Sequence, residues 1–254
     1  MNTRDLFVSA LGIVLILGSA ACAFGSPPEP SSIPSPQATE APEPPESPIS
    51  VSGSMSFASR YLFQGIDYSA GKPVLNPEAD LTWGPIGAKL WVNHDLDLRV
   101  SNEYDFSILH EWKAKAFSFT TGYTYLWYPH RDGWDPSQEI YLEASREGAL
   151  NPTASIHYDF DAGVGSYSTF GLSHGFERKA GTLTVGTNLF YQDHYYGLSG
   201  FPSSEWNLRF EKSLRGATLT PSVSRFVTWA NGDFRDENAI PSTWLFSFTV
   251  ARDF

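Results

Sequence analysis

Charged and imidazole side chains recur two residues apart along this chain. The pairs are Glu78 with Asp80, Glu103 with Asp105, His157 with Asp159, and Arg209 with Glu211. Residues i and i+2 of an extended strand point to the same side, so each pair would present two polar groups to one face. Such faces could hold or guide small ions, and a His beside a carboxylate could transfer a proton. This chemistry needs strands whose polar faces lie opposite one another.

Alternating polarity over nearly the whole chain predicts those strands. In residues 115–127, for example, one parity carries aromatic side chains and the other carries Ser, Thr and Gly. Period-2 alternation of this kind is typical of a half-buried strand. The pattern predicts twelve strands, at approximately 52–66, 76–83, 86–94, 102–112, 115–127, 138–146, 152–160, 166–177, 182–192, 204–212, 217–229 and 243–254.

The connections between these strands alternate in length. Short ones lie at 84–85, 112–115, 146–151, 178–181 and 212–216, and mostly longer ones near 67–75, 95–101, 128–137, 161–165, 193–203 and 230–242. An even strand number with short turns at one end and long loops at the other is typical of bacterial outer-membrane barrels. The sequence therefore predicts an all-β fold, a closed antiparallel transmembrane β-barrel of about twelve strands, located in the outer membrane of a Gram-negative-type bacterium.

The carboxy-terminal strand carries the strongest single signal. Its aromatic residues Trp244, Phe246, Phe248 and Phe254 share one parity, which would turn them toward lipid. We expect them to serve membrane assembly. Aromatic girdles are expected at the two rims, from Trp83, Trp112 and Phe210 at the inner one and from Trp127, Tyr128, Tyr191 and Trp229 at the outer one.

One strand fits the pattern less well. Pro221 lies inside the eleventh predicted strand and cannot donate to its ladder, and Arg225 has the parity of the apolar residues around it. A β-bulge between Pro221 and Arg225 would restore the parity.

The amino terminus predicts export. Residues 1–23 have a short charged start, an apolar core and a small-residue end, which is typical of a signal peptide. Cleavage after Ala23 would remove Cys22, the only cysteine; the alternative is that Cys22 becomes a lipidated first residue. Residues 24–50 are rich in Pro and predict a disordered linker, and residues 51–254 form the predicted barrel.

Composition excludes some functions. The net charge of −11 argues against nucleic acid as a partner, because phosphates would be repelled. A single cysteine allows no disulfide within the chain. No motif calls for a cofactor.

The inward parity defines the candidate site. We expect the lumen to be lined by Arg60, Gln64, Glu78, Asp80, Lys89, Glu103, Asp105, Glu143, His157, Asp159, Arg209 and Glu211. Seven of these side chains are acidic, whereas three are basic. This excess predicts either a hydrated path that prefers cations or charges that pair across the lumen and close it.

The stretch from Tyr61 to Ser69, followed by Pro73, resembles the opening strand of TorF-type porins, also labelled Gcw-type conserved hypothetical proteins. Their Tyr-x-Phe-Arg-Gly-Ile-x-x-Ser pattern is matched except that Gln64 replaces the arginine. The similarity in residues covers only the first hairpin. It implies a porin-like barrel of unspecified cargo.

Two catalytic patterns have simpler interpretations. Gly171 to Gly175 matches G-x-S-x-G, but it lies within a predicted strand with no helix after it. His157 with Asp159 could assist a serine in a lipid-modifying enzyme, although a hydrogen-bonded lumen histidine is the simpler interpretation. At 93–97 and 130–135 a His lies near carboxylates, which could hold a divalent cation. We expect these segments to be solvated loops and expect no metal site.

The sequence thus predicts passive transport of a small polar solute or cation and no enzymatic activity. A non-transporting scaffold is the alternative, and a lipid-modifying barrel enzyme is a third. Expected partners are outer-membrane lipid and the barrel-assembly machinery, whereas the partner of the Pro-rich arm is unknown.

Overall fold

The computed structural model describes residues 49–235, 238 and 240–254. The expected signal peptide, Cys22 and nearly all of the linker therefore lie outside the described residues. Among the described residues, no helix is long and apolar enough to cross a membrane.

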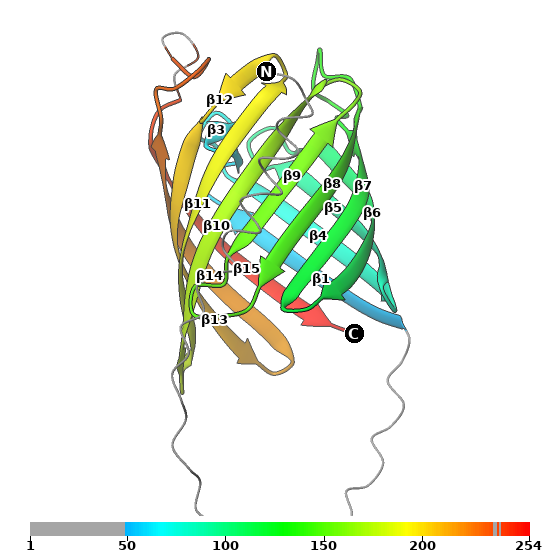
Figure 1. The fold of residues 1–254 in the computed structure, drawn as a ribbon, viewed down its shortest axis with the longest axis vertical. Coiled ribbons are helices and arrows are strands. Elements are labelled where there is room, and N and C mark those ends of the chain that lie inside the picture. The colour runs from blue at the N-terminus through cyan, green and yellow to red at the C-terminus, as the bar shows by residue number, and fades with distance from the viewer. Residues whose placement is uncertain (1–48, 236–237, 239) are drawn as a thin grey trace, which may run out of the picture. The chain divides into compact units, whose positions relative to one another are not determined.

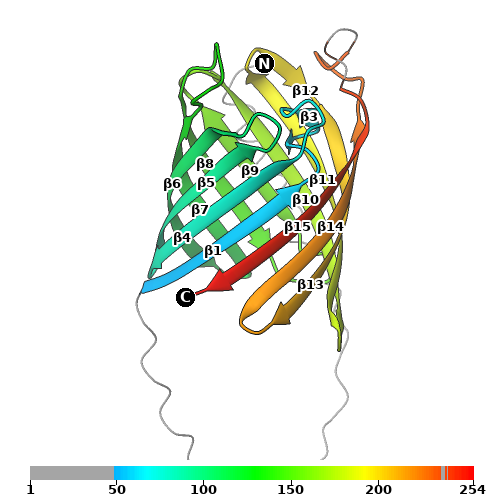
Figure 2. The same cartoon turned by 180° about the vertical axis from the view of Figure 1, so that it is seen from behind.

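The described chain forms one closed antiparallel barrel of twelve strands (Figures 1 and 2). The wall strands are β1 Ile49–Ala58, β4 Val74–Trp83, β5 Ile86–Asp95, β6 Val100–Ala114, β7 Phe117–Trp127, β8 Ser137–Arg146, β9 Thr153–Asp159, β10 Gly165–Arg178, β11 Gly181–Tyr195, β13 Ser203–Leu214, β14 Ala217–Thr228 and β15 Thr243–Asp253. The short strand β12, Leu198–Gly200, pairs antiparallel with the end of β11. Strands β2, Leu62–Phe63, and β3, Ile66–Asp67, form a separate two-stranded sheet.

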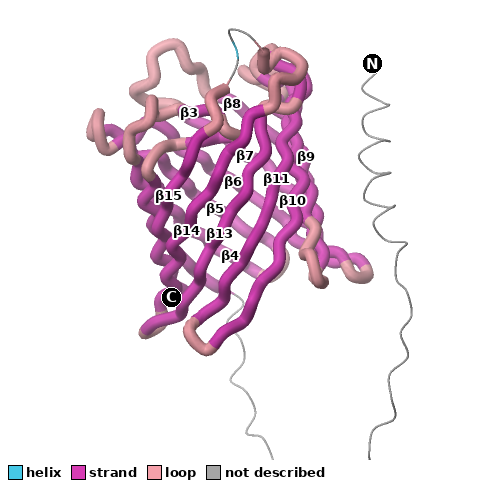
Figure 3. Tube along the Cα trace, turned by 90° about the vertical axis from the view of Figure 1, so that its left-hand side faces the viewer, coloured by secondary structure: helices cyan, strands magenta, loops and turns pink. Residues whose placement is uncertain are grey.

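Pairing of the first and last strands closes the barrel. Strand β1 pairs with β15 from Ser52 with Asp253 to Ala58 with Ser247, and every other wall strand pairs with its neighbours in sequence. A closed ladder leaves no unpaired strand edge. Short turns gather at one end of the barrel, here called the turn end, and longer loops at the other, the loop end (Figure 3).

The outer surface is apolar. Trp244, Phe246 and Phe248 are each more than two-fifths exposed, although they are large and hydrophobic. Large exposed residues occur on other strands too, with Trp83 and Trp112 toward the turn end and Trp127 and Trp229 toward the loop end. A closed barrel whose outer surface exposes this many large apolar side chains has the wall that contact with lipid requires.

Eleven of the twelve expected strands agree with the observed bounds to within three residues. The first does not. Strand β1 ends at Ala58, whereas the sequence predicted one strand to residue 66; the chain instead leaves the wall and forms the β2–β3 hairpin. Gln64 and Gly65 both have positive φ, 52° and 89°, which a tight two-residue hairpin turn requires and a straight strand cannot contain.

The expected bulge in β14 is also wrong. Pro221 pairs with Phe248 and Arg225 with Trp244 in one unbroken register. The Arg225 guanidinium lies 5.3 Å from the centroid of the exposed Trp244 ring, near the loop end. An outward arginine is tolerated there because its charged tip lies over an aromatic face close to the barrel rim.

A charge in the middle of the outer wall should destabilise the barrel. Phe248 lies at the centre of β15 and faces outward, so Phe248→Arg should lower the free energy of unfolding in lipid by about 2–4 kcal/mol. Thr249→Arg is the matched control, because the Thr249 hydroxyl donates to Ser56 on the inner face. The measurement is urea unfolding in vesicles, followed by the different gel migration of unboiled and boiled protein. Equal losses in both variants would contradict the lipid-facing assignment.

Candidate functional site

The β2–β3 hairpin folds into the lumen at the loop end (Figure 2). At its tip, Gly65 lies so close to β13 that a Cβ there would be 2.6 Å from the Ser203 hydroxyl oxygen. Ser203 Oγ donates to the Gln64 carbonyl oxygen at 2.6 Å, and Gln192 Nε2 of β11 donates to Gln64 Oε1 at 2.8 Å. The sequence predicted that Gln64 lies in a wall strand. Gln64 instead lies at the hairpin tip, where it is buried against the wall.

The same hairpin also reaches the opposite wall. The Tyr61 hydroxyl donates to Glu103 Oε1 of β6 at 3.0 Å, and its ring lies 5.6 Å from the ring of Trp91 on β5. Strands β5 and β11 are separated by half of the twelve-strand circuit. The hairpin therefore crosses the lumen from one side to the other.

The base of the hairpin is held by local contacts. Arg60, expected on a wall strand, instead forms an ion pair with Asp67 at 3.2 Å. The Ser69 hydroxyl accepts from the Tyr61 amide at 2.8 Å and donates to the Lys72 carbonyl at 2.7 Å. These bonds close residues 61–72 into a compact loop.

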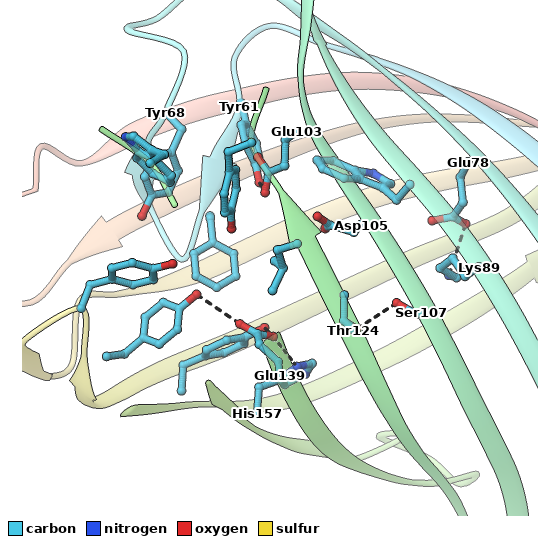
Figure 4. Close-up of a pocket in the computed structure, with 18 residues that line it drawn as sticks. Tyr61, Tyr68, Glu78, Lys89, Glu103, Asp105, Ser107, Thr124, Glu139 and His157 are labelled. Atoms are coloured by element: carbon cyan, nitrogen blue, oxygen red, sulfur yellow. Dashed lines mark hydrogen bonds and ion pairs between the residues drawn. The ribbon is translucent and has the colours of Figure 1, made fainter. Parts of the chain in front are cut away.

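A cavity of about 260 Å³ lies beside the hairpin inside the barrel (Figure 4). Half of its lining residues are aromatic: Tyr61, Phe63, Tyr68, Trp91, Tyr128, Trp134, Tyr167, Tyr195 and Tyr196. Its charged and imidazole lining residues are Glu78, Lys89, Glu103, Asp105, Glu139 and His157. Five of the expected lumen residues thus line one cavity, together with Glu139, which the sequence prediction missed.

Glu139 on β8 is the centre of a cluster of hydrogen-bonded side chains. It is only 2% exposed, and it accepts from the hydroxyls of Tyr167 at 2.9 Å and Tyr195 at 3.3 Å. His157 lies between two carboxylates, with Nδ1 3.4 Å from Glu139 and Nε2 3.7 Å from Glu143. The imidazole contacts these carboxylates and not Asp159, the partner that the sequence suggested.

Glu103 and Asp105 on β6 differ in their partners. Glu103 accepts from Tyr61, and Arg131 Nη2 lies 3.9 Å from its second oxygen. The Arg131 guanidinium lies over three aromatic rings, 4.8 Å from the centroid of Trp134 and 5.8 Å from those of Tyr61 and Tyr68. Asp105 Oδ1, by contrast, is shielded from solvent and has no hydrogen-bond partner within the described chain.

The remaining expected lumen residues form separate groups. Lys89 Nζ lies 3.3 Å from Glu78 and 3.4 Å from Asp80, and Arg209 pairs with Glu211 at 3.2 Å. Asp159 is fully buried and accepts from the Ser137 hydroxyl at 2.7 Å. Pairing thus neutralises part of the predicted acid excess, but no ion pair within the described residues reaches Asp105.

A second space of about 200 Å³ lies toward the turn end. Its lining is small and mostly Ser and Thr, with Glu143 as its single charged residue. The lumen therefore has two levels, an aromatic and acidic one under the hairpin and a polar one near the turns.

Sequence reasoning missed several lining residues. Glu139 could have been found, because it has the parity of Glu143 on the same strand. Tyr68 and Trp134 could not, because they lie in loops, where the side-chain direction has no period. Tyr128, expected in the outer girdle, is buried and lines the cavity, since it follows the end of β7 where the alternation stops.

The alternative chemistries receive no support from the geometry. Among the described residues, no group of three or more His, Cys, Asp or Glu side chains could hold a metal ion. Ser173 of the G-x-S-x-G match lies within β10, paired with Gly186 on β11, and so is not on the sharp turn that an activated serine needs.

The loop tyrosines of the cavity are poor acids. Burial, reinforced by the negative charge of Glu103, raises the pKa of Tyr68 to about 12 and holds the pKa of Tyr61 well above its usual range. Burial likewise raises the pKa of Tyr196 to about 12 and strongly raises that of Tyr128. These phenols therefore stay neutral at physiological pH, and the Tyr61 hydroxyl remains a donor to Glu103.

A spectroscopic titration should detect these tyrosines. In the folded protein the tyrosinate absorbance should rise in two phases, with the loop tyrosines ionising only near or above pH 12. In denaturant all twelve should titrate near pH 10. Because the raised pKa favours the folded state only while the phenols are protonated, stability should fall as pH rises above about 10. A single folded phase near pH 10 would contradict the buried hairpin.

Comparison with known proteins identifies no family: no family model matches the chain, and no curated protein matches its sequence. Similar solved structures include an outer membrane channel from Pseudomonas putida F1, with 8% identity, TM-score 0.45 and coverage of 81% of this chain and 95% of that one. CdiB from Acinetobacter baumannii has 7% identity and TM-score 0.40 over 82% of this chain and 60% of its own. A mutant Rh. blastica porin has 12% identity and TM-score 0.31 over 81% and 99%. At such TM-scores the likenesses are weak, and the resemblance to TorF-type porins stays a prediction.

Proposed function

We propose that this protein is an outer-membrane β-barrel that lets small polar solutes or cations pass, and that the β2–β3 hairpin narrows its path. Two features support the membrane location. The outer wall is apolar, and the closed strand ladder pairs the backbone groups that lipid could not hydrogen-bond. The turn end, where both chain termini of the barrel lie, would face the periplasm. Folding would then require outer-membrane lipid and the barrel-assembly machinery as partners.

The observation that carries the proposal is the character of the lumen. Its two spaces, about 260 Å³ and 200 Å³, are both lined partly by polar or charged side chains. The lining carboxylates outnumber Lys89, the one lining residue with a permanent positive charge. A confined surface with this charge balance favours cations over anions.

The hairpin is the natural gate of such a path. Its tip is held by two uncharged wall residues, because Ser203 and Gln192 each donate a hydrogen bond to Gln64. Hydrogen bonds of this kind contribute on the order of 1 kcal/mol each, so these two bonds alone would not fix the tip in place. Loop segments that seal a site commonly move on microsecond to millisecond timescales.

The scaffold alternative rests on one observation, that the hairpin and its aromatic neighbours cross the whole lumen. If the hairpin never moves, the barrel is closed and serves as an anchor for its loops and its Pro-rich arm, whose partner is unknown. A lipid-modifying enzyme is not favoured. The contacts of His157 are carboxylates and aromatic rings rather than a serine.

A disulfide across the hairpin tip should separate the channel from the scaffold. A Cβ on Gly65 would lie 3.0 Å from the Ser203 Cβ, which is shorter than the roughly 3.5–4.5 Å of a disulfide, so Gly65→Cys with Ser203→Cys should form a bond once the tip moves away from β13 and relieves the strain of a cysteine at φ 89°. In planar bilayers the oxidised double variant should lose the single-channel steps of the wild type, and reduction should restore them. The Gly65→Cys single variant is the control. If the wild type shows no single-channel steps, and a variant with a shortened hairpin at residues 61–68 shows none either, the scaffold alternative would be supported instead.

Ion selectivity should depend on the β6 carboxylates. Glu103→Gln with Asp105→Asn keeps side-chain volume and removes two charges, and it leaves Arg131 without its carboxylate. In a salt gradient the reversal potential should move toward zero from a cation-selective wild-type value. Glu211→Gln is the control, because Glu211 pairs with Arg209 outside the cavity and should shift the potential less. An anion-selective wild type would refute the proposed lumen charge.

A further inference from the structure

We propose that the cavity under the hairpin binds a small organic cation, an alkylated ammonium such as a quaternary amine, between Asp105 and Glu139. This inference rests on the proposed function in that it names the substrate class of the channel. The two carboxylates project into the cavity from β6 and β8 (Figure 4).

The first argument is a carboxyl oxygen without a partner. Asp105 Oδ1 lines a buried cavity and has no hydrogen-bond partner in the part of the chain that the structure describes. A buried carboxyl oxygen without a partner is costly, so its presence beside an empty volume indicates a missing partner, and the nearby carboxylates of Glu103 and Glu139 favour a cationic one. Lys89 is occupied by Glu78 and Asp80, and Arg131 lies against Glu103, so neither cation neutralises Asp105.

The second argument is the chemistry of the walls. Tyr128, Tyr167, Tyr195 and Trp91 line the cavity with aromatic rings. Ring faces attract cations that are weakly hydrated, and aromatic cages of this kind recognise quaternary ammonium groups. A metal ion would need several oxygen or nitrogen ligands, and the described acidic and His residues provide no such set.

The chain itself supplies a precedent beside the cavity. The Arg131 guanidinium, an organic cation, lies over Trp134, Tyr61 and Tyr68 with Glu103 as its counter-ion. Asp105 lies two residues after Glu103 on β6 and lines the same aromatic cavity. No cation of the described chain pairs with it. The volume of about 260 Å³ equals roughly eight or nine waters at about 30 Å³ each, which is enough for a small alkylammonium.

Titration calorimetry on the purified full chain in detergent tests the proposal, with choline chloride as the probe. At low salt and about pH 8.5, choline should bind at least tenfold more tightly than 3,3-dimethyl-1-butanol, its neutral counterpart of the same shape, and than potassium. Equal binding of choline and the neutral alcohol, or no heat with either at millimolar concentration, would overturn the proposal.

Two substitutions locate the site. Asp105→Asn and Tyr128→Leu should each weaken choline binding about tenfold or more, whereas Asp80→Asn, which alters a carboxylate outside the cavity lining, should not. Unchanged binding in Asp105→Asn would overturn the assignment. Potassium conductance of the same preparations separates the two proposals: conductance without choline binding refutes only the organic-cation site, and choline binding without conductance refutes only the channel.

Discussion

Closure of the strand ladder is the constraint on which the rest of this structure depends. Once β1 pairs with β15, every wall strand has two neighbours, and the outer face can be apolar without exposing backbone groups to lipid. Closure with twelve strands has a second effect. Eight-stranded barrels are filled by their own side chains, whereas a wider ring leaves interior space. The hairpin occupies part of that space, and the two cavities lie in the part that remains.

Burial of polar groups then decides how the interior is arranged. Ser137 donates to Asp159, Tyr167 and Tyr195 donate to Glu139, and Lys89 lies between Glu78 and Asp80. Each group satisfies carboxylates that closure has removed from bulk water. Among the described residues that line the cavity, Asp105 Oδ1 and His157 Nδ1 are the exceptions, because neither atom has a hydrogen-bond partner; Nδ1 still lies 3.4 Å from Glu139.

The sequence predicted the wall well because strand periodicity is local. Inward and outward parity follow directly from the alternation, so the outward Trp244, Phe246 and Phe248 and the inward Glu103 and Asp105 were found without any knowledge of neighbours. The family resemblance covered Tyr61 to Ser69 but presented that stretch as a strand. The positive φ of Gln64 has no strong signature in sequence, since glutamine rarely adopts it.

The tertiary contacts of the site could not be predicted in the same way. Tyr128 lines the cavity from a loop, Arg131 reaches Glu103 from the same loop, and the partners of His157 depend on how β8 and β9 align. Parity tells which face a residue occupies but not which residue lies opposite, because register depends on all the turns together. The pairing of Glu139 with His157, and the crossing of the lumen by the hairpin, became visible only with the closed barrel.

The hairpin also carries no net charge, because Arg60 and Asp67 neutralise each other and the residues between them are uncharged. An electric field across a membrane does work on a moving segment in proportion to its charge, about 2.3 kcal/mol per elementary charge per 100 mV. A neutral hairpin that moves as a unit gains almost nothing from such a field. Its position in the lumen is therefore governed by contacts with the walls and with whatever occupies the cavity, and not by voltage.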